Sequence, residues 1–187
     1  MHVQVKVMPT TRMAPGPACQ ADWDLQFTHD STSHYARVRN MPDMSAFTLT
    51  FFVNSASNRT TQYLVSYYTD VNQNMIVVRT NTFQVTVHGS AVSLSSINLH
   101  DGAWHHVAIT WTRATNQSLV FFDGAVVNQR TVAGTTISGA GGVFLLGQEQ
   151  DAGGSLDASQ IFSPGRANQV RRWAGRGIDV MRLGKSS

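Results

Sequence analysis

The sequence predicts an all-β protein, built as a two-sheet antiparallel β-sandwich of the jelly-roll type. Short runs of β-branched and aromatic residues alternate with turn residues, two Asp-Gly pairs separate runs, and no stretch repeats apolar residues at helical spacing. Many short strands without helices bury their apolar faces by packing one sheet on another. The expected strands are residues 35–39, 47–53, 63–68, 75–79, 83–88, 104–112, 119–122 and 143–146.

Tight turns are expected at the Asp-Gly pairs, because glycine tolerates positive φ and an aspartate side chain can bond its own backbone. Asp101-Gly102 precedes the run 104–112. Asp123-Gly124 lies between the runs 119–122 and 125–127, at the spacing of a two-residue hairpin. The second pair therefore predicts an antiparallel hairpin.

The run 104–112 is predicted to be a central strand, because neither of its two faces reads as solvent-exposed. His105 and His106 within it suggest a metal or catalytic site. Adjacent residues of a strand point to opposite faces, however, so the two rings cannot share one ion. We therefore expect buried, hydrogen-bonded core histidines.

The chain is long enough for one domain, with 187 residues of which 42% are hydrophobic. Residues 1–24 are expected to form a flexible segment, since they contain prolines and no apolar run of the length of a signal peptide or membrane span. Residues 25–162 form the predicted domain. Residues 163–187 are expected to be a basic tail without strands.

Charge argues against a nucleic-acid partner. Residues 1–165 hold eight Lys and Arg against ten Asp and Glu, so the net charge of +3 comes from the tail. Cys19 is the only cysteine, which excludes an internal disulfide and a thiolate metal site. Membrane insertion is not expected either. Glycosylation sequons begin at Asn58 and Asn116, as would suit a secreted protein.

Acidic and amide side chains gather in residues 147–160. This run holds the only glutamate, Glu149, together with Asp151 and Asp157. Calcium takes six to eight oxygen ligands, and carboxylates and amides supply them without nitrogen or sulfur. A helix-loop-helix calcium site is excluded, because no helices flank the run and its last residue is Gln160. The alternative is a solvated surface loop.

The run 147–160 closely resembles the calcium loop of the pentraxins. Residues 101–107 with Thr110-Trp111 resemble a second hallmark of that family. Residues 44–49 with Ser66-Tyr67 resemble the earlier strands of the family. The resemblance extends from about residue 25 to residue 162. It implies a sandwich of the concanavalin and laminin-G-like type.

The resemblance implies a pair of calcium ions. Glu149, the main-chain carbonyl of Gln150, Asp151, Asp157 and Gln160 would coordinate them. A second loop of the family adds an Asp-Asn pair, and the matching positions here are Asn72 and Gln73, with Asp70 nearby. One carboxylate is then replaced by a neutral amide, which lowers the charge of the site.

Two departures from the family bear on stability. The family's inter-sheet disulfide would need cysteines at Thr50 and Ala108. After Phe162 the sequence has no alternating apolar pattern, so the family's last strands and helix have no predicted counterpart. We would then expect unpaired sheet edges and an exposed part of the core.

The function implied is a calcium-dependent, extracellular binding module, not an enzyme. Its ligands would be phosphocholine-like, phosphorylated or acidic glycans, bound by a cyclic homo-oligomer, possibly a pentamer, in innate recognition or synaptic organisation. Two alternatives remain. One is a calcium-independent, laminin-G-like adhesion module. The other is a sandwich-fold glycosidase, for which only Glu149 with Asp151 or Asp157 could supply the two carboxyls.

Overall fold

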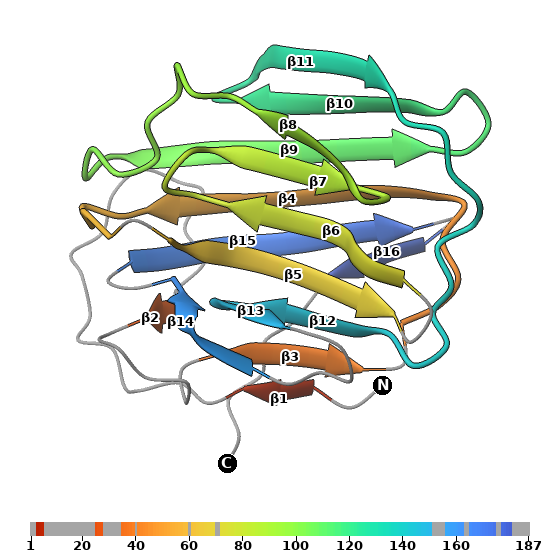
Figure 1. Cartoon of the computed structure of the whole chain (residues 1–187), viewed down its shortest axis with the longest axis horizontal. Coiled ribbons are helices and arrows are strands. Elements are labelled where there is room, and N and C mark those ends of the chain that lie inside the picture. The colour runs from red at the N-terminus through yellow and green to blue at the C-terminus, as the bar shows by residue number, and fades with distance from the viewer. Residues whose placement is uncertain are drawn as a thin grey trace.

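The computed structural model describes residues 3–5, 25–27, 35–39, 41–59, 61–69, 72–150, 156–162, 165–174 and 177–180. These residues form strands and turns, with no helix among them. Two large sheets lie face to face, and a small third sheet lies beside them (Figure 1). The strands are β1 Val3–Val5, β2 Leu25–Phe27, β3 Ala36–Arg39, β4 Ala46–Asn54, β5 Tyr63–Thr69, β6 Asn72–Arg79, β7 Gln84–Val87, β8 Ser90–Ser93, β9 Trp104–Thr112, β10 Gln117–Phe122, β11 Ala125–Thr131, β12 Val143–Leu146, β13 Gln148–Gln150, β14 Leu156–Ile161, β15 Gly165–Ala174 and β16 Gly177–Val180.

Sheet A has the strand order β1-β3-β12-β5-β6-β7-β8. Sheet B has the order β11-β10-β9-β4-β15-β16, and β2 also pairs with β15. Neighbouring strands pair antiparallel in both sheets. The predicted all-β, two-sheet antiparallel sandwich is therefore confirmed, and each of the eight expected strands has a counterpart in the structure.

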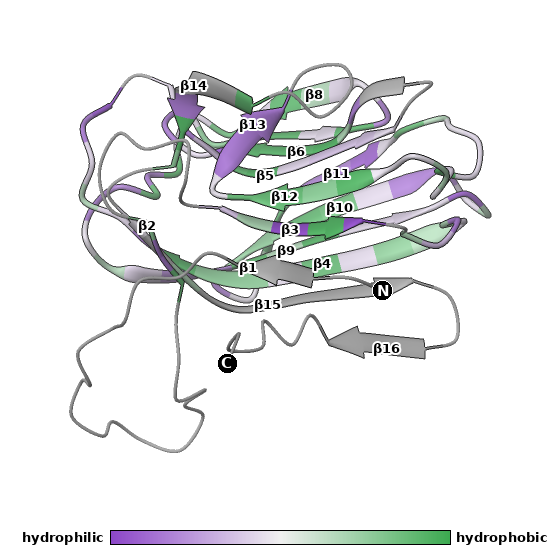
Figure 2. Ribbon diagram, turned by 90° about the horizontal axis from the view of Figure 1, so that it is seen from below, coloured by the Kyte–Doolittle hydropathy of each residue, from purple (hydrophilic) through white to green (hydrophobic). Residues whose placement is uncertain are grey.

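The core lies between the sheets and follows the period of two that strands impose. In β4, Phe47, Leu49, Phe51 and Val53 point inward and are at most 3% exposed. Their partners in the core come from both sheets, and Figure 2 shows apolar residues along strands of both sheets. Trp111 is the largest fully buried side chain among the described residues.

Strand β9 lies between β10 and β4, so its predicted central position is confirmed. The expectation that neither face is exposed is wrong at its start, where Trp104 is 42% exposed on the outer side of sheet B. The β10–β11 hairpin is also confirmed. Asp123 and Gly124 have φ of 48° and 84°, the pair of positive values that a type I′ turn requires.

The prediction of no strands after Phe162 is wrong. Strand β15 pairs with β4 on one side and with β16 on the other. Sheet B therefore continues past β4, and Ala167 is completely buried. This strand is defined by backbone pairing, because its sequence lacks the alternation on which the prediction relied. Within the segment 1–24, expected to be flexible, β1 pairs with β3.

Thr50 and Ala108 lie directly opposite each other in β4 and β9. Both strands belong to sheet B, so the expectation that these positions link the two sheets is wrong. A disulfide here would join neighbouring strands of one sheet. Cys19 lies outside the described residues. The described part of the chain contains no helix long and apolar enough to cross a membrane.

Candidate functional site

The acidic run identified in the sequence forms a small hairpin, with strands β13 and β14 at its ends. The hairpin lies on the outer side of sheet A, away from sheet B (Figure 2). Gln148 pairs with Ile161 and Gln150 with Leu156. The run expected as a loop therefore begins and ends in strands that hold it against sheet A.

Gly147 fixes the point where the chain leaves sheet A for this hairpin. Its φ of 89° is strained for other residues, and a Cβ atom here would overlap the Phe27 ring. The Gly147 amide donates to the Leu64 carbonyl at 2.8 Å, and the Gly147 carbonyl accepts from the Phe162 amide at 2.9 Å. These bonds tie the base of the hairpin to the sheet.

The side chains of β13 point to alternate sides. Gln150 points into the protein, where its amide nitrogen donates to the carbonyls of Ser66 and Val143 at 3.0 and 2.8 Å. Its side chain is thus engaged, and the main-chain carbonyl is the part of Gln150 that a ligand could use. Glu149 points away from these contacts and lines a pocket, although it is only 6% exposed.

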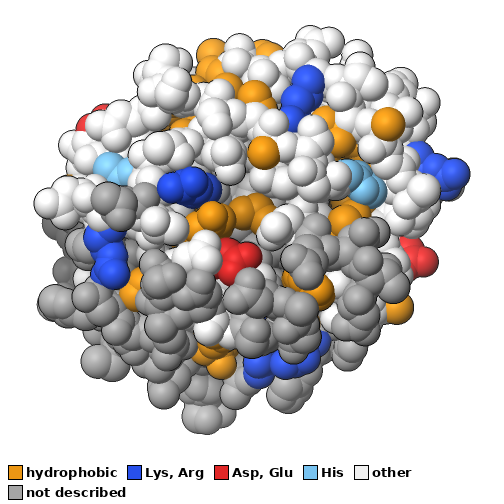
Figure 3. Space-filling model, viewed as in Figure 1, with side chains coloured by type: hydrophobic (Ala, Val, Ile, Leu, Met, Phe, Trp, Pro, Cys, Tyr) orange, Lys and Arg blue, Asp and Glu red, His pale blue; other side chains and the backbone are white. Residues whose placement is uncertain are grey.

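The pocket has a volume of about 260 Å³. Glu149 and Gln160 come from the hairpin, and the remaining described residues of its lining come from three strands of sheet A. Charged side chains are few and dispersed on this face (Figure 3). Glu149 is the only charged residue among the described lining, and oxygen-bearing side chains predominate. The lining is Tyr63, Asn74, Val77, Gln84, Thr86, Glu149 and Gln160.

The structure brings together Glu149 and Gln160 of the predicted ligands. Asp151 and Asp70 lie outside the described residues. Asp157 lies in β14, and Asn72 and Gln73 lie in β6, where only their backbone is described. Within the described residues, no group of three His, Cys, Asp or Glu side chains could hold a metal. The coordination that the resemblance implies therefore remains a prediction.

Asn74 also lines the pocket, although the sequence did not indicate it as a ligand. Strands β5 and β6 change register between Tyr67 and Thr69, so counting residues along the loop does not give the position of each side chain. Asn74 has a φ of 56°, a left-handed conformation that asparagine adopts more readily than most residues. Asn72 and Asn74 both lie at the start of β6, and the sequence alone gives no signal that tells which of them contacts a ligand.

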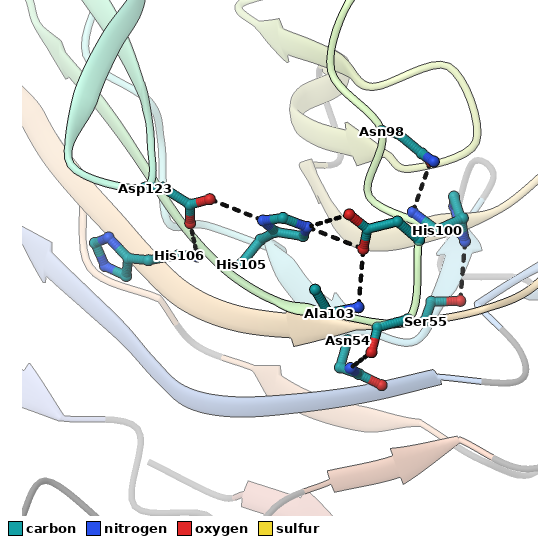
Figure 4. Close-up of polar contacts among 10 residues, drawn as sticks. Asn54, Ser55, Asn98, His100, Ala103, His105, His106 and Asp123 are labelled. Atoms are coloured by element: carbon teal, nitrogen blue, oxygen red, sulfur yellow. Dashed lines mark hydrogen bonds and ion pairs between the residues drawn. The ribbon is translucent and has the colours of Figure 1, made fainter.

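A second polar cluster joins two turns at one end of the sandwich (Figure 4). His105 Nδ1 lies 2.8 Å from Asp123 Oδ2, and His105 Nε2 lies 3.1 Å from both Asp101 carboxylate oxygens. The expected hydrogen bonding of His105 is therefore confirmed, but the expected place in the core is wrong, because its partners are exposed turn carboxylates. His106 lies on the other face, where its ring is 4.9 Å from that of Phe52.

The cluster changes the charge state of its members. Burial lowers the pKa of His105, but hydrogen bonds to Asp123 and Asp101 outweigh burial, so the pKa lies above its ordinary 6.5. The Ala103 amide and then His105 lower the pKa of Asp101. For Asp123, burial is outweighed by bonds from His105 and the His106 amide, and the pKa is again lowered. An ion pair is thus favoured.

Comparisons with known proteins agree on the architecture. Residues 30–168 match the family described as the concanavalin A-like lectin/glucanases superfamily. C-reactive protein 1.4 of Limulus polyphemus is 30% identical over 161 residues, which cover 80% of this chain and 66% of that protein. Neuronal pentraxin-2 of Mus musculus is 30% identical over 145 residues, which cover 74% of this chain and 33% of that protein.

The fold is also found among solved structures. The native heptameric SAP-like pentraxin from Limulus polyphemus superposes with a TM-score of 0.63 and 22% identity, over 79% of this chain and 74% of that chain. The present chain spans about two thirds of the Limulus C-reactive protein and a third of the mouse neuronal pentraxin.

Proposed function

Because the chain belongs to the pentraxins, within the concanavalin A-like lectin and glucanase superfamily, we propose that it is a calcium-dependent binding module for phosphorylated or acidic glycan ligands. The observation that carries the proposal is the position of Glu149. This carboxylate is 6% exposed and lines a pocket whose other described residues are mostly oxygen-bearing side chains.

The chemistry of this lining suits a hard cation. Calcium prefers carboxylate and amide oxygens as ligands, and the described lining offers both kinds around one pocket. Glu149 and Gln160 would be ligands from the hairpin, and β6 would add Asn74 to the expected Asn72 and Gln73.

Further ligands would come from the same hairpin. The Gln150 carbonyl is available because the Gln150 side chain is held by Ser66 and Val143. Asp151 and Asp157 complete the proposed set. Six to eight oxygens are needed for each ion, so the proposed second ion depends on sharing Glu149 between the two.

Calcium in such a site would also provide the ligand-binding group. A surface site leaves coordination positions that a phosphate, a carboxylate or sugar hydroxyls can fill. The pocket is smaller than the roughly 300–1,000 Å³ that encloses drug-sized ligands, so a single sugar ring or phosphorylated head group is the expected size.

Assembly and location belong to the same proposal. Weak single sites gain avidity when several act together, so we expect a cyclic homo-oligomer. The Limulus structure is a heptamer, which leaves the number of subunits here open between that and a pentamer. Extracellular calcium modules have dissociation constants of about 10⁻⁴ to 10⁻³ M, and a secreted protein would meet enough calcium to fill them.

A binding module explains the pocket better than a glycosidase does. Hydrolysis of a glycosidic bond needs two carboxyls on either side of it. The described lining provides one, Glu149, and a carboxylate bound to calcium stays ionised, which makes it a poor proton donor.

Retention on a resin that carries phosphate monoesters tests the proposal. The chain should be retained in calcium and eluted by a chelator, and Glu149→Gln should abolish retention. Asp43→Asn is a matched control, because Asp43 does not line the pocket and an asparagine can still accept the Gly139 amide. Retention that persists in chelator would favour the calcium-independent, laminin-G-like alternative.

A further inference from the structure

A row of three directly paired residues on neighbouring strands runs beside the pocket. Tyr63 of β5 pairs with Arg79 of β6, and Arg79 pairs with Gln84 of β7. Directly paired residues point to the same face of a sheet. Tyr63 and Gln84 line the pocket, so Arg79 lies between two residues of the lining.

The Arg79 side chain has a defined position beside the pocket. Its guanidinium carbon lies 6.0 Å from the centre of the Tyr63 ring, in a cation–π arrangement. Arg79 Nε donates to Asn81 Oδ1 at 2.9 Å, and the same oxygen accepts the Gln62 amide at 3.2 Å. These contacts place a positive charge at the Tyr63 side of the pocket.

A ligand with a positive group would find no favourable position there. Proteins bind quaternary ammonium groups with aromatic faces and negative charge. Tyr63 is the only aromatic residue of the described lining, and it already contacts the cation of Arg79. Glu149, the only acid of that lining, is assigned to calcium.

We propose that Arg79 makes the pocket select ligands with a second negative group besides the one bound to calcium. Acidic sugars that carry a phosphate, sulfate or second carboxylate are the class that fits. Phosphocholine is disfavoured, because its ammonium would approach a guanidinium. This selectivity rests on the proposed calcium function, since calcium is what holds the first anionic group.

The test uses three ligands that share a phosphate and differ in the charge of the tail. These are phosphocholine with a positive tail, glycerol 3-phosphate with a neutral tail and 3-phosphoglycerate with a negative tail. Affinities are measured by calorimetry in saturating calcium for the full chain. We expect 3-phosphoglycerate to bind about tenfold or more tightly than phosphocholine, with glycerol 3-phosphate between them.

Variants assign the effect to Arg79. Arg79→Gln should remove most of the preference without abolishing calcium binding, whereas Arg79→Lys should keep the preference. Arg113→Gln, which removes an arginine that bonds Thr136 outside the pocket, should behave as the wild type. The Lys variant also detects a merely structural role, since it loses the planar contacts but keeps the charge.

The outcomes separate this inference from the function on which it rests. Equal affinities for the three ligands, a preference for phosphocholine, or an unchanged preference in Arg79→Gln would overturn the role of Arg79 while leaving calcium-dependent binding intact. If the wild type bound no ligand in calcium, the proposed function and this inference would fail together.

Discussion

His105 Nδ1 lies 2.8 Å from Asp123 Oδ2, so a histidine at the start of β9 contacts the turn that joins β10 to β11. The other ring nitrogen contacts Asp101 in the turn before β9. One imidazole therefore links two turns that are separated in the sequence (Figure 4). The contribution of His105 to the stability of the fold depends on whether its ring is protonated.

The first prediction concerns pH. The folded pKa of His105 is raised, so its contribution is fully present below the unfolded value of about 6.5 and is lost as the pH rises through the folded value. The aspartates have lowered pKa values, so their contribution is lost only in acid. Thermal unfolding of wild type and His105→Gln should show that the excess stability of the wild type is largest below about pH 6.5 and shrinks as the pH rises above it.

Taking the difference between the two proteins removes the effect of other histidines. Burial lowers the pKa of His88 and of His100, so both destabilise the fold as the pH falls below 6.5, in wild type and variant alike. If the difference in stability between wild type and His105→Gln did not change with pH, protonation of His105 would not contribute to the stability of the fold.

The second prediction concerns Gly147. Replacing it with alanine adds the strain of a positive φ and a collision with Phe27, so Gly147→Ala should cost about 2–5 kcal/mol of unfolding free energy. Gly124→Ala is the matched control, because its φ is 84° and nothing lies within 4 Å of the added atom. Denaturant unfolding should show a cost of only about 1–2 kcal/mol there. Equal costs would contradict the assigned contact with Phe27.

The third prediction concerns an engineered disulfide between β4 and β9. Thr50 and Ala108 are direct partners in β4 and β9, and direct partners have Cα atoms about 4.5–5.5 Å apart, within the range for a disulfide. The double variant Thr50→Cys with Ala108→Cys, made in a Cys19→Ser background, should oxidise and gain about 2–4 kcal/mol over its reduced form. Failure to oxidise, while both single variants fold, would show that the pairing is out of register.

Strands could be predicted from the sequence where alternation and turns agree, as in β9 and the β10–β11 hairpin. Both signals are local, so they can be recognised without knowing the partner strands. Strand β15 could not be predicted, because it is specified by pairing with β4, which is distant in the sequence. Half of its ten residues are polar, and the polar and apolar residues do not alternate with a period of two.

The residues of the candidate site could likewise be predicted only in part. Glu149 and Gln160 could be proposed because they lie in one short run, which the family resemblance reinforced. Asn74 could not, because a register shift between β5 and β6 means that counting residues along the loop does not give the position of its side chain. Arg79 required the pairing of three strands, and the role of His105 required two turns to meet.

The central claim is that Glu149 holds calcium, and calorimetric titration of calcium into the chain tests it most directly. We predict two ions per chain with dissociation constants of about 10⁻⁴ to 10⁻³ M, weakened about tenfold or more in Glu149→Gln and only slightly in Asp70→Asn. Asp43→Asn should titrate as the wild type. Absence of binding at millimolar calcium, or a Glu149→Gln variant that binds like the wild type, would contradict the account.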